Sequence, residues 1–551
     1  MSESATVTVA RPVTAAAGVF APGHVGELTQ YLPFELVDDV LSETKTVQRR
    51  LRDLPSRVGV YFVLALVLFP RLGYARVWQK LTAGLIGLDV ASPSEKALRD
   101  LRRRLGPAPF KALFEVVAGP LGQPHTPGVC YRGMRTVAFD GCNSLRVPDT
   151  ERNRSWLGRI RYRMGFAGYP TLRMMTLIET GTRGMIGAVL GSAADRDEAT
   201  LARRLLPLLH PSMVVLLDRA FDAAAFLNEL NETGARFLVR SKSTRRPPVL
   251  THLPDGSFLS DLRGLPVRII DAELTVTGVD GSRVRDRYRL ITTLLDHDHH
   301  PAAELVRLYH ERWEIEIAYL ALRHTILDGH VLRSQDRPGL EQEVWALLTV
   351  YQLLRMAMVT AVESRPDTNP DRASFTTALQ TARDQLIAAD GIVPTSQPGK
   401  PGKPDHTDLL GAIGRAVLAT LLPPRRLRWS TRRLKNATSR YLNRDDRRPH
   451  LPTTIASIEV TLHTPSLDKT PRPRHRKPGN PNAAPTRREI ITALMQDDPS
   501  RPWHGRELAD KLAIKPRNML TQLAEWTRHG FLTRTNAGTY QLPTRHDAPS
   551  P

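Results

Sequence analysis

The chain has 551 residues, a length that favours several domains over a single core. Its 77 Lys and Arg residues outnumber its 56 Asp and Glu residues, which gives a formal net charge of +21. This charge favours a polyanionic partner such as nucleic acid, although an arginine-rich composition alone would also produce it. Two cysteines are too few for a disulfide framework in a chain of this size, so the sequence predicts a cytoplasmic protein.

No segment of the chain is predicted to cross a membrane. The most apolar run, residues 58–69, is about 12 residues long, which is too short for a bilayer and typical of a buried helix. The N-terminus lacks a cationic start followed by an apolar block, so no secretory signal is expected. Residues 1–30 are predicted to form a flexible leader.

Two regions of different periodicity follow the leader. Between residues 31 and 122, apolar-periodic stretches broken by Pro and Gly predict an all-helical N-terminal domain. From residue 130 to about 365, short β-like runs alternate with helical segments, which predicts a mixed sheet covered by helices. Two predicted strands end in an acid, at Asp140 and at Asp218, and open α/β sheets place ligand groups at the carboxyl ends of strands.

Residues 242–296 are predicted to form a β-rich insertion within the sheet domain, because two Asp-Gly turn signals there lie between extended runs. The segment Asp296 to His300 that ends it is rich in Asp and His. A metal cluster would account for this composition, but adjacent residues rarely converge on one ion, so a polar strand-to-helix turn is favoured.

The C-terminal part is more basic. Residues 371–450 are predicted to form a helical basic extension, in which residues 425–448 hold ten Arg and Lys against two Asp. This density favours contact with phosphates over a solvated helix end. Residues 451–485 are Pro-rich and basic, and are predicted to form a disordered linker.

Residues 486–545 read as three helices followed by a hairpin. This order predicts a winged-helix-like module whose third helix enters a major groove, and a three-helix interaction module is the alternative. Near the start of the third helix, Lys515, Arg517 and Asn518 are candidate DNA contacts.

Residues 305–323 (LVRLYHERWEIEIAYLALR) are expected to form one helix with a charged stripe. At about 100° per residue, the stripe consists of Tyr309, Arg312, Glu316 and Arg323 and lies between two apolar flanks. A charged stripe in this position is predicted to line a cleft, where a carboxylate holds a metal ion and the cations hold phosphates.

Three acids on separate elements, Asp140, Asp218 and Glu316, are therefore the candidate catalytic and metal-binding residues. Phosphodiester chemistry uses carboxylates that converge on two Mg²⁺ ions, because these hard cations prefer oxygen ligands and stabilise both the attacking and the leaving oxygen. Each Asp alone is weak support, since most such residues are caps or turn residues.

These residues resemble the DDE transposases of the insertion sequence 4 family, whose last acid lies in a pattern of Tyr, two residues, Arg, three residues, Glu, six residues and Lys. Tyr309, Arg312, Glu316 and Arg323 fit this spacing, with Arg in place of Lys at the last position. The sequence also resembles the family around the first acid, in DGCNSLRVPDT, and around the second, in LLDRAF followed by FLVRSK. The resemblance implies that Tyr309, Arg312 and Arg323 grip phosphates of the DNA near the transposon end. The last segment contains Arg240 and Lys242, which join these candidate DNA contacts.

The resemblance implies a ribonuclease H-like α/β catalytic core, two Mg²⁺ ions for which Mn²⁺ can substitute, and hydrolytic nicking of DNA at transposon ends followed by strand transfer into target DNA. It also implies a homodimer in the synaptic complex and a nucleoid-associated cytoplasmic enzyme. Two alternatives remain open from the residues alone. One is a non-catalytic DNA-binding regulator, and the other is a ribonuclease H-like nuclease without strand transfer.

Overall fold

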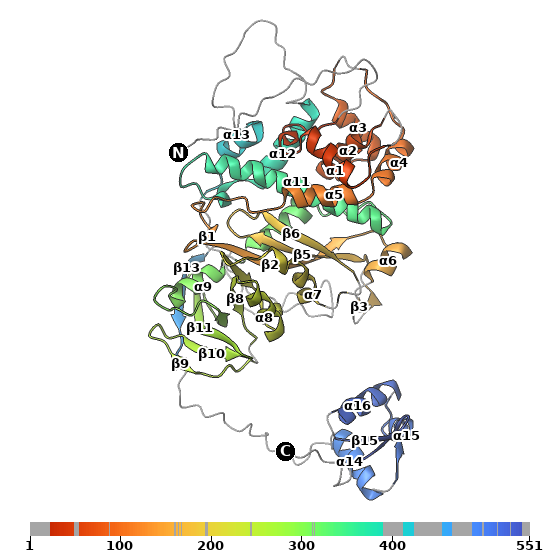
Figure 1. Ribbon diagram of the computed structural model, residues 1–551, viewed down its shortest axis with the longest axis vertical. Coiled ribbons are helices and arrows are strands. Elements are labelled where there is room, and N and C mark those ends of the chain that lie inside the picture. The colour runs from red at the N-terminus through yellow and green to blue at the C-terminus, as the bar shows by residue number, and fades with distance from the viewer. Residues whose placement is uncertain are drawn as a thin grey trace. The chain divides into compact units, whose positions relative to one another are not determined.

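The computed structural model divides the chain into two compact units, Met1–Pro465 and Ser466–Pro551, which are described separately (Figure 1). The described residues are 23–48, 54–86, 89–158, 161–162, 165–166, 168–192, 195, 197–242, 245–310, 312, 314–389, 411–423, 455–464, 487–498, 501–514, 516–528 and 531–542. The basic segment 425–448 lies outside these residues.

An eleven-stranded sheet forms the centre of the first unit (Figure 1). Its strands, in spatial order, are β6 (Met185–Gly191), β5 (Thr171–Glu179), β2 (Met134–Arg146), β7 (Met213–Leu217), β8 (Arg236–Arg240), β12 (Arg283–Thr292), β11 (Leu265–Gly278), β10 (Phe258–Leu262) and β9 (Thr251–His252), with β1 (Cys130–Tyr131) paired to β2 and β13 (Ile455–Leu462) paired to β11. Strands β2, β7 and β8 are parallel, whereas β5 and β6 run antiparallel to their neighbours. This mixed sheet is consistent with a ribonuclease H-like core.

The side chains of the sheet alternate between two hydrophobic clusters. Ala138 and Leu216 belong to the larger cluster, whereas Phe139 and Leu217 belong to the smaller one, as the two-residue period of a strand requires. The smaller cluster is completed by α7 (Glu198–Ala202), η2 (Arg203–Leu208) and α8 (Ala224–Glu232). The larger is completed by α9 (Ala302–His310), α10 (Glu314–Leu320), η5 (Ala321–Ile326), α11 (Arg337–Glu363) and α12 (Phe375–Ala388).

The N-terminal helices pack on the same face as α11 (Figure 1). They are α1 (Phe34–Glu43), α2 (Ser56–Leu68), α3 (Tyr74–Thr82), α4 (Glu95–Leu105) and α5 (Ala108–Val117). The apolar run at α2 is a buried core helix, as predicted, with every residue from Val58 to Leu68 buried. Helix α11 is long and apolar enough to cross a bilayer, but 89% of its most apolar window is buried inside the protein.

The prediction of a flexible leader is wrong for residues 23–30. Val25 and Leu28 are 1% and 0% exposed, and η1 (Leu28–Tyr31) begins within this segment. The ring of His24 is hydrogen-bonded through Nε2 to the carbonyl oxygen of Leu81 at 2.9 Å. Burial of these apolar side chains against the helical core fixes the segment.

The insertion strands β9 to β12 continue the central sheet, because β12 pairs with β8. The prediction of a disordered linker over 451–485 is also wrong where β13 lies. Ile458, Val460 and Leu462 pack against the larger cluster, and the strand pairs with β11 over residues 272–278. The alternating pattern IASIEVTL explains this strand, since one face of it is apolar.

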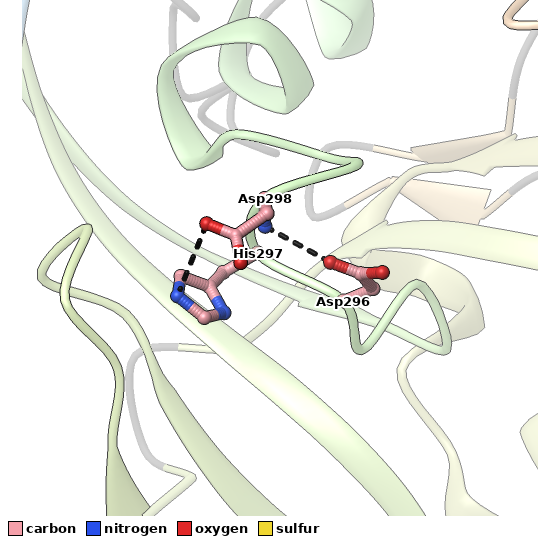
Figure 2. A group of neighbouring side chains, drawn as sticks. All are labelled: Asp296, His297 and Asp298. Carbon is pink, nitrogen blue, oxygen red and sulfur yellow. Dashed lines mark hydrogen bonds and ion pairs between the residues drawn. The ribbon is translucent and has the colours of Figure 1, made fainter.

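The strand-to-helix segment before α9 is a turn organised by Asp296 (Figure 2). One carboxylate oxygen of Asp296 accepts the backbone N–H groups of Asp298 and His299, at 3.0 and 2.9 Å. The pKa of Asp296 is lowered, chiefly by the hydrogen bond from the backbone of His299. This agrees with the predicted polar turn.

The remaining described elements of the first unit are short. They are α6 (Glu151–Leu157), β3 (Arg161–Tyr162), β4 (Gly165–Phe166), η3 (Arg219–Phe221), η6 (Pro370–Arg372) and α13 (Gly411–Ala419). The second unit consists of α14 (Arg487–Asp497), β14 (Trp503–His504), α15 (Gly505–Lys511), α16 (Pro516–Arg528), β15 (Thr533–Asn536) and β16 (Thr539–Gln541). Its strands form one sheet in the order β14-β16-β15, and it has its own core, in which Leu508, Leu523 and Tyr540 are buried.

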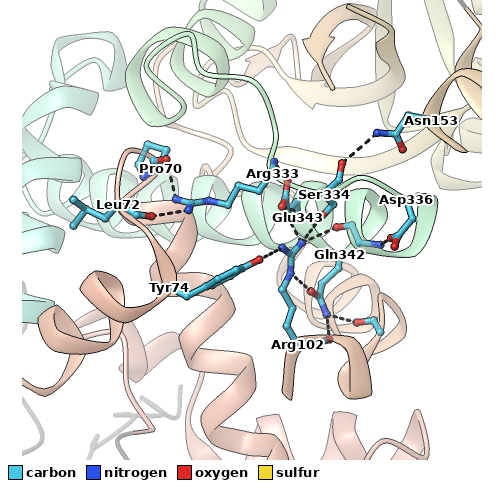
Figure 3. A network of polar contacts seen from close by, with 12 residues as sticks. Pro70, Leu72, Tyr74, Arg102, Asn153, Arg333, Ser334, Asp336, Gln342 and Glu343 are labelled. Carbon is cyan, nitrogen blue, oxygen red and sulfur yellow. Dashed lines mark hydrogen bonds and ion pairs between the residues drawn. The ribbon is translucent and has the colours of Figure 1, made fainter. Parts of the chain in front are cut away.

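A buried polar network joins the N-terminal helices to the start of α11 (Figure 3). Arg102 of α4 is 6% exposed and forms an ion pair with Glu343 at 2.9 Å. It also donates hydrogen bonds to Gln342, Tyr74 and Ser334. Arg333 donates to the carbonyl oxygens of Phe69, Pro70 and Leu72, which follow the last residue of α2. The network therefore fixes the chain on both sides of Ser334.

We expect Arg102→Met to lower the free energy of unfolding by about 3–5 kcal/mol, because Glu343 would remain buried without its cation. Urea denaturation followed by circular dichroism measures this loss. The matched control is Arg103→Met on the same helix, since Arg103 is exposed and its nitrogen lies 3.8 Å from Asp100. The control should change stability by less than about 1 kcal/mol. Equal losses in both variants would contradict the role given to Arg102.

Candidate active site

Asp140 lies within β2, and Asp218 directly follows the parallel strand β7, so the register of the two strands sets these acids side by side. Ala138 of β2 is in register with Leu216 of β7. Asp140 follows Ala138 by two residues, and Asp218 follows Leu216 by two residues. Asp218 directly follows the end of β7, as predicted. The expectation that β2 ends at Asp140 is wrong, because β2 continues to Arg146 beside the neighbouring strand β5.

The two acids share one face of the sheet by register. Ala138 and Leu216 both belong to the larger cluster, and a spacing of two residues returns a strand side chain to the same face. One carboxylate oxygen of Asp218 accepts the backbone N–H of Ala220 at 2.7 Å, which caps the short helix η3. The same face receives Ala318 and Tyr319 of α10, so this helix lies on the side toward which both acids are directed.

Burial raises the pKa of Asp140 to about 7. The nearby carboxylates of Asp218 and Glu198 raise this pKa further, whereas the Arg312 guanidinium lowers it. A carboxyl group in this setting gains from a bound cation, because a cation offsets both the loss of water and the repulsion between acids. The pair is therefore suited to hold a divalent metal ion.

The expectation of one continuous helix over 305–323 is wrong. The described residues form α9, which ends at His310, then α10, which begins at Glu314, and then η5, which has π-helical hydrogen bonding. Single π turns occur often at functional sites, because they change the angular spacing of the side chains that follow. The predicted stripe therefore does not keep a spacing of 100° per residue to Arg323.

Two members of the stripe nevertheless lie beside the acids. Tyr309 is buried and donates its hydroxyl hydrogen bond to the carbonyl oxygen of Leu217, the residue before Asp218, at 3.1 Å. Arg312 is 9% exposed and acts electrostatically on both Asp140 and Tyr309. Both residues are therefore placed at the end of β7.

Arg323 contacts β2 further along the strand. Its Nη1 donates to the hydroxyl of Ser144 at 2.8 Å, and its Nε donates to the carbonyl oxygen of Tyr319 at 3.4 Å. Glu316 lies in α10, one helical turn before Tyr319, and its side chain lies outside the described residues.

Tyr319 makes a contact that the sequence did not predict, because the helical pattern assigns it to an apolar flank of the stripe. Its hydroxyl donates to the carbonyl oxygen of Asp140 at 2.6 Å and lies 2.7 Å from the hydroxyl of Thr176. Burial raises the pKa of Tyr319 well above its usual value, so this hydroxyl stays protonated. A Tyr in an apolar helix flank gives no sequence signal for such a bond.

Asp255 and Arg268 were also not predicted, and they anchor the start of α9. Asp255 accepts the backbone N–H of Ala302 at 2.9 Å and forms an ion pair with Arg268. Arg268 is fully buried and also donates to the carbonyl oxygen of His300 at 2.7 Å. The insertion strands therefore hold the helix that carries Tyr309.

The other candidate DNA contacts are spread over both units. Arg240 ends β8 and lies 3.4 Å from Asp286 in an ion pair. Burial raises the pKa of Tyr309, and the charge of Arg240 partly opposes this rise. Lys242 is exposed, and its backbone N–H donates to Asp222 at 2.7 Å. In the second unit, Asn518 is exposed in the first turn of α16. Lys515 and the side chain of Arg517 lie outside the described residues.

One further group among the described residues could share an ion. Ligand atoms of Asp296, His297 and Asp298 lie within 4.8 Å of one another (Figure 2). The hydrogen bonds within the turn account for this geometry, since Asp296 already accepts two backbone N–H groups. The acid pair on β2 and β7 is thus the better candidate for a catalytic metal.

Comparisons with known proteins identify the family of the chain. Residues 22–115 match the family described as "Insertion element 4 transposase N-terminal", and residues 132–353 match "Transposase DDE domain". The chain is 26% identical over 424 residues to "Transposase InsG for insertion sequence element IS4" of Escherichia coli (strain K12), covering 75% of this chain and 92% of that relative. This chain is a DDE transposase of the insertion sequence 4 family.

Two more proteins are similar to this DNA transposase. "Putative transposase InsZ" of Escherichia coli (strain K12) is 25% identical over 206 residues, which cover 37% of the transposase and 67% of InsZ. A solved structure, "Cryo-EM structure of piggyBac transposase synaptic complex with hairpin DNA (SNHP)", covers 69% of the transposase and 86% of its own chain. Its identity is 11% and its TM-score 0.35.

In the metal-free transposase, we expect Asp140→Asn to be more stable than the parent at pH 8, with a smaller advantage at pH 5. The parent carboxyl has a pKa of about 7 when folded and 3.8 ordinarily, so the folded state keeps a proton that the unfolded state has lost. The stability of the parent must therefore fall as pH rises between these two pKa values. The variant has no carboxyl group at this position, so it does not share this loss. The advantage in the free energy of unfolding should grow by on the order of 2 kcal/mol between pH 5 and 8.

Urea unfolding at several pH values, in the presence of a chelator, measures this difference. Asp384→Asn is the control, because Asp384 is an exposed carboxylate on α12 and should show no such trend. If the advantage of Asp140→Asn in the free energy of unfolding were the same at every pH, the Asp140 carboxyl would have the same pKa in the folded and the unfolded state, which would contradict the prediction.

Proposed function

We propose that the transposase cuts DNA at transposon ends and joins them to target DNA with Asp140, Asp218 and Glu316 as its catalytic, metal-holding acids. The register of β2 and β7 is the observation that carries this proposal, because it sets two carboxylates side by side. Glu316 joins them because α10 lies on the same face, one turn before the residue that contacts the backbone of Asp140.

The proposed reaction has two steps. In the first, the oxygen of a water molecule bonds to phosphorus while the bond from phosphorus to the 3′ oxygen breaks. The water gives up a proton to solvent, and the departing 3′ oxygen takes up a proton from solvent and becomes the 3′-hydroxyl. In the second, the freed 3′-hydroxyl attacks a target phosphodiester in the same way. A new phosphodiester forms, and the 3′ oxygen of the target strand leaves with a proton.

The donor set fits hard divalent cations, with two Mg²⁺ ions as the proposed cofactor and Mn²⁺ as a substitute. The carboxylates offer oxygen ligands, and the burial that raises the pKa of Asp140 disfavours its charged form unless a cation lies nearby. Divalent ions held there would lower the pKa of the attacking hydroxyl group and stabilise the leaving oxygen. The chain itself fixes the acids through the register of the strands and the bond from Tyr319.

Cations around the acid pair are proposed to hold the DNA backbone. Arg312, Arg323 and Arg240 are contributed by separate segments that meet at β2, β7 and β8. Guanidinium groups suit this role because they bind phosphate in a bidentate manner. Lys242 would extend the contact surface as an exposed cation, and Tyr309 would fix the end of β7 beside the phosphate.

The second unit is proposed to be a winged-helix module that binds duplex DNA. Its order of helix, strand, two helices and two strands, with a three-stranded sheet, supports this assignment. Helix α16 would enter the major groove with Lys515, Arg517 and Asn518 near its start. We further propose that two copies of the chain act together on a pair of ends, and that the enzyme works in the cytoplasm on nucleoid DNA.

We expect Glu316→Gln to reduce strand cleavage by at least about 100-fold, because a metal-holding carboxylate is replaced by a neutral amide. Binding to end DNA should change little. Gel electrophoresis of labelled end DNA measures cleavage, and fluorescence anisotropy measures binding. Glu115→Gln removes an exposed carboxylate paired with Lys111 and should cleave normally. Normal cleavage by the Glu316 variant would remove this residue from the site.

The same assay separates a transposase from a nuclease of similar fold. Supercoiled target plasmid is added with the labelled ends, and joined products are resolved by size. We expect joining as well as cutting, because the freed 3′-hydroxyl stays at the acids for the second step. Cut ends without joined products would support a nuclease.

For the second unit, we expect replacement of Lys515, Arg517 and Asn518 by Ala in the full chain to weaken duplex binding. The slope of log affinity against log salt should fall by about 2, since two cations no longer release counterions. Arg487→Ala at the start of α14 is the control for loss of positive charge and should reduce the slope by less. An unchanged affinity for duplex DNA and an unchanged salt slope would contradict DNA binding by these residues of the second unit.

A further inference from the structure

Helix α10 bonds to the sheet beside Asp140 through a buried hydroxyl group. Tyr319 is 5% exposed, and its hydroxyl donates to the carbonyl oxygen of Asp140 at 2.6 Å. The hydroxyl of Thr176 on β5, which is fully buried, lies 2.7 Å from the same Tyr319 oxygen. Since Tyr319 gives its one hydroxyl hydrogen to the carbonyl, Thr176 donates to Tyr319.

The strand pairing brings these groups to one level of the sheet. Thr176 is the residue of β5 that lies opposite Asp140 on β2. Opposite residues of an antiparallel pair share a face, so Thr176 lies on the face where α10 packs. Two hydrogen bonds in series therefore join α10, β5 and β2 beside the acid.

A hydroxyl group supplies what apolar packing at this helix does not. Helix α10 has seven residues and is followed directly by η5, so it gains little rigidity from its own length. The apolar side chain of Ala318 is buried there, but apolar contacts have no preferred direction. A buried hydroxyl must keep its partners, and its bonds are directional. These bonds therefore fix the rotation of α10 over the strands.

A second contact links the same segment to β2. Nε of Arg323 donates to the carbonyl oxygen of Tyr319 at 3.4 Å, and Nη1 of Arg323 donates to the hydroxyl of Ser144 at 2.8 Å. The segment formed by α10 and η5 is thus bonded to β2 at Asp140 and again at Ser144. Two attachment points along one strand prevent the segment from sliding along it.

We propose that Tyr319 and Thr176 are positioning residues of the active site, which hold α10 at a fixed separation from the backbone of Asp140. Glu316 precedes Tyr319 on α10 by about one helical turn, so a shift of the helix at Tyr319 would carry the backbone of Glu316 with it. This inference rests on the proposed function of Asp140, Asp218 and Glu316. Neither hydroxyl group is assigned a contact with the metal or the DNA.

Tyr319→Phe in the full-length transposase removes the hydroxyl group and keeps the ring. We expect kcat for cleavage of labelled end DNA to fall by about tenfold with little change in KM, because carboxylates that are held less precisely serve the reaction less well. The Kd for Mn²⁺ should rise by about tenfold for the same reason. Gel electrophoresis measures cleavage, and electron paramagnetic resonance of the free ion measures Mn²⁺ binding without DNA.

Tyr61→Phe is the matched control. Tyr61 is also buried, and its hydroxyl donates to a backbone carbonyl oxygen, that of Leu32, at 2.7 Å. Both variants should lose stability in urea unfolding, since each leaves a buried carbonyl without this donor. Only Tyr319→Phe should change kcat and the Kd for Mn²⁺. A folded Tyr319→Phe variant with the parent's kcat and Kd would overturn the proposal.

Two substitutions at Thr176 test the other hydroxyl group. Thr176→Val removes the hydroxyl and keeps the shape of the side chain, so kcat and the Kd for Mn²⁺ should change in the same direction as in Tyr319→Phe. Thr176→Ser keeps the hydroxyl and should retain most of the parent's kcat. Equal losses in the two variants would overturn the role of this hydroxyl. If Tyr319→Phe unfolds, Thr176→Val supplies the test, and parental values there would overturn the proposal.

Asp140→Asn distinguishes this inference from the function beneath it. If Asp140→Asn abolishes cleavage and Tyr319→Phe keeps the parent's kcat and Kd, then Tyr319 has a structural role only and the acids still hold the metal. If Asp140→Asn cleaves DNA and binds Mn²⁺ like the parent, the metal site at β2 and β7 is itself wrong.

Discussion

The parallel register between β2 and β7 is the constraint on which the active site depends. Backbone hydrogen bonds pair Ala138 with Leu216, and the two-residue period then sets Asp140 and Asp218 on one face at the same level. Neighbouring strands lie about 4.8 Å apart, a spacing that two carboxylates tolerate only with a cation or a shared proton between them. Burial chiefly raises the pKa of Asp140, and the nearby Asp218 raises it further. Strand pairing, rather than the conformation of flexible side chains, therefore brings the two carboxylates close enough for a bound cation to stabilise them.

The other groups reach this pair because two anchors fix the chain that carries them. At the start of α9, Asp255 and the buried Arg268 connect the insertion to the helix. At the start of α11, Arg102 and Glu343 connect the N-terminal helices to the segment after η5. The chain between these anchors includes Tyr309, Arg312, Glu316 and Arg323. Buried ion pairs contribute modest net stability but penalise alternative arrangements, so they suit the task of fixing position.

The sequence was sufficient to predict the strand that leads to Asp218, since a run of five apolar residues before an acid is typical of a buried strand. It also predicted the buried helix α2 from its apolar run. It did not predict that α9 ends at His310 and that α10 begins at Glu314, because the apolar period continues past Arg312, which is not α-helical. The strand β13 was missed because its pairing partner, β11, lies about 180 residues earlier. Local pattern identifies an element, but long-range pairing decides where it lies.

The contacts missed at the active site share a physical cause. Tyr319 acts through a bond from its hydroxyl to a backbone carbonyl, and Asp255 acts by accepting the backbone N–H of Ala302, so neither has a motif of its own. The bond from Tyr319 reaches the carbonyl oxygen of Asp140 just past the last residues that β2 pairs with β7. An unpaired backbone edge next to a buried acid offers carbonyl oxygens and open space. Side chains of the helix packed on that face can reach it, as Tyr319 of α10 does, so the end of a parallel pairing, rather than the acids alone, defines where further active-site residues are to be sought.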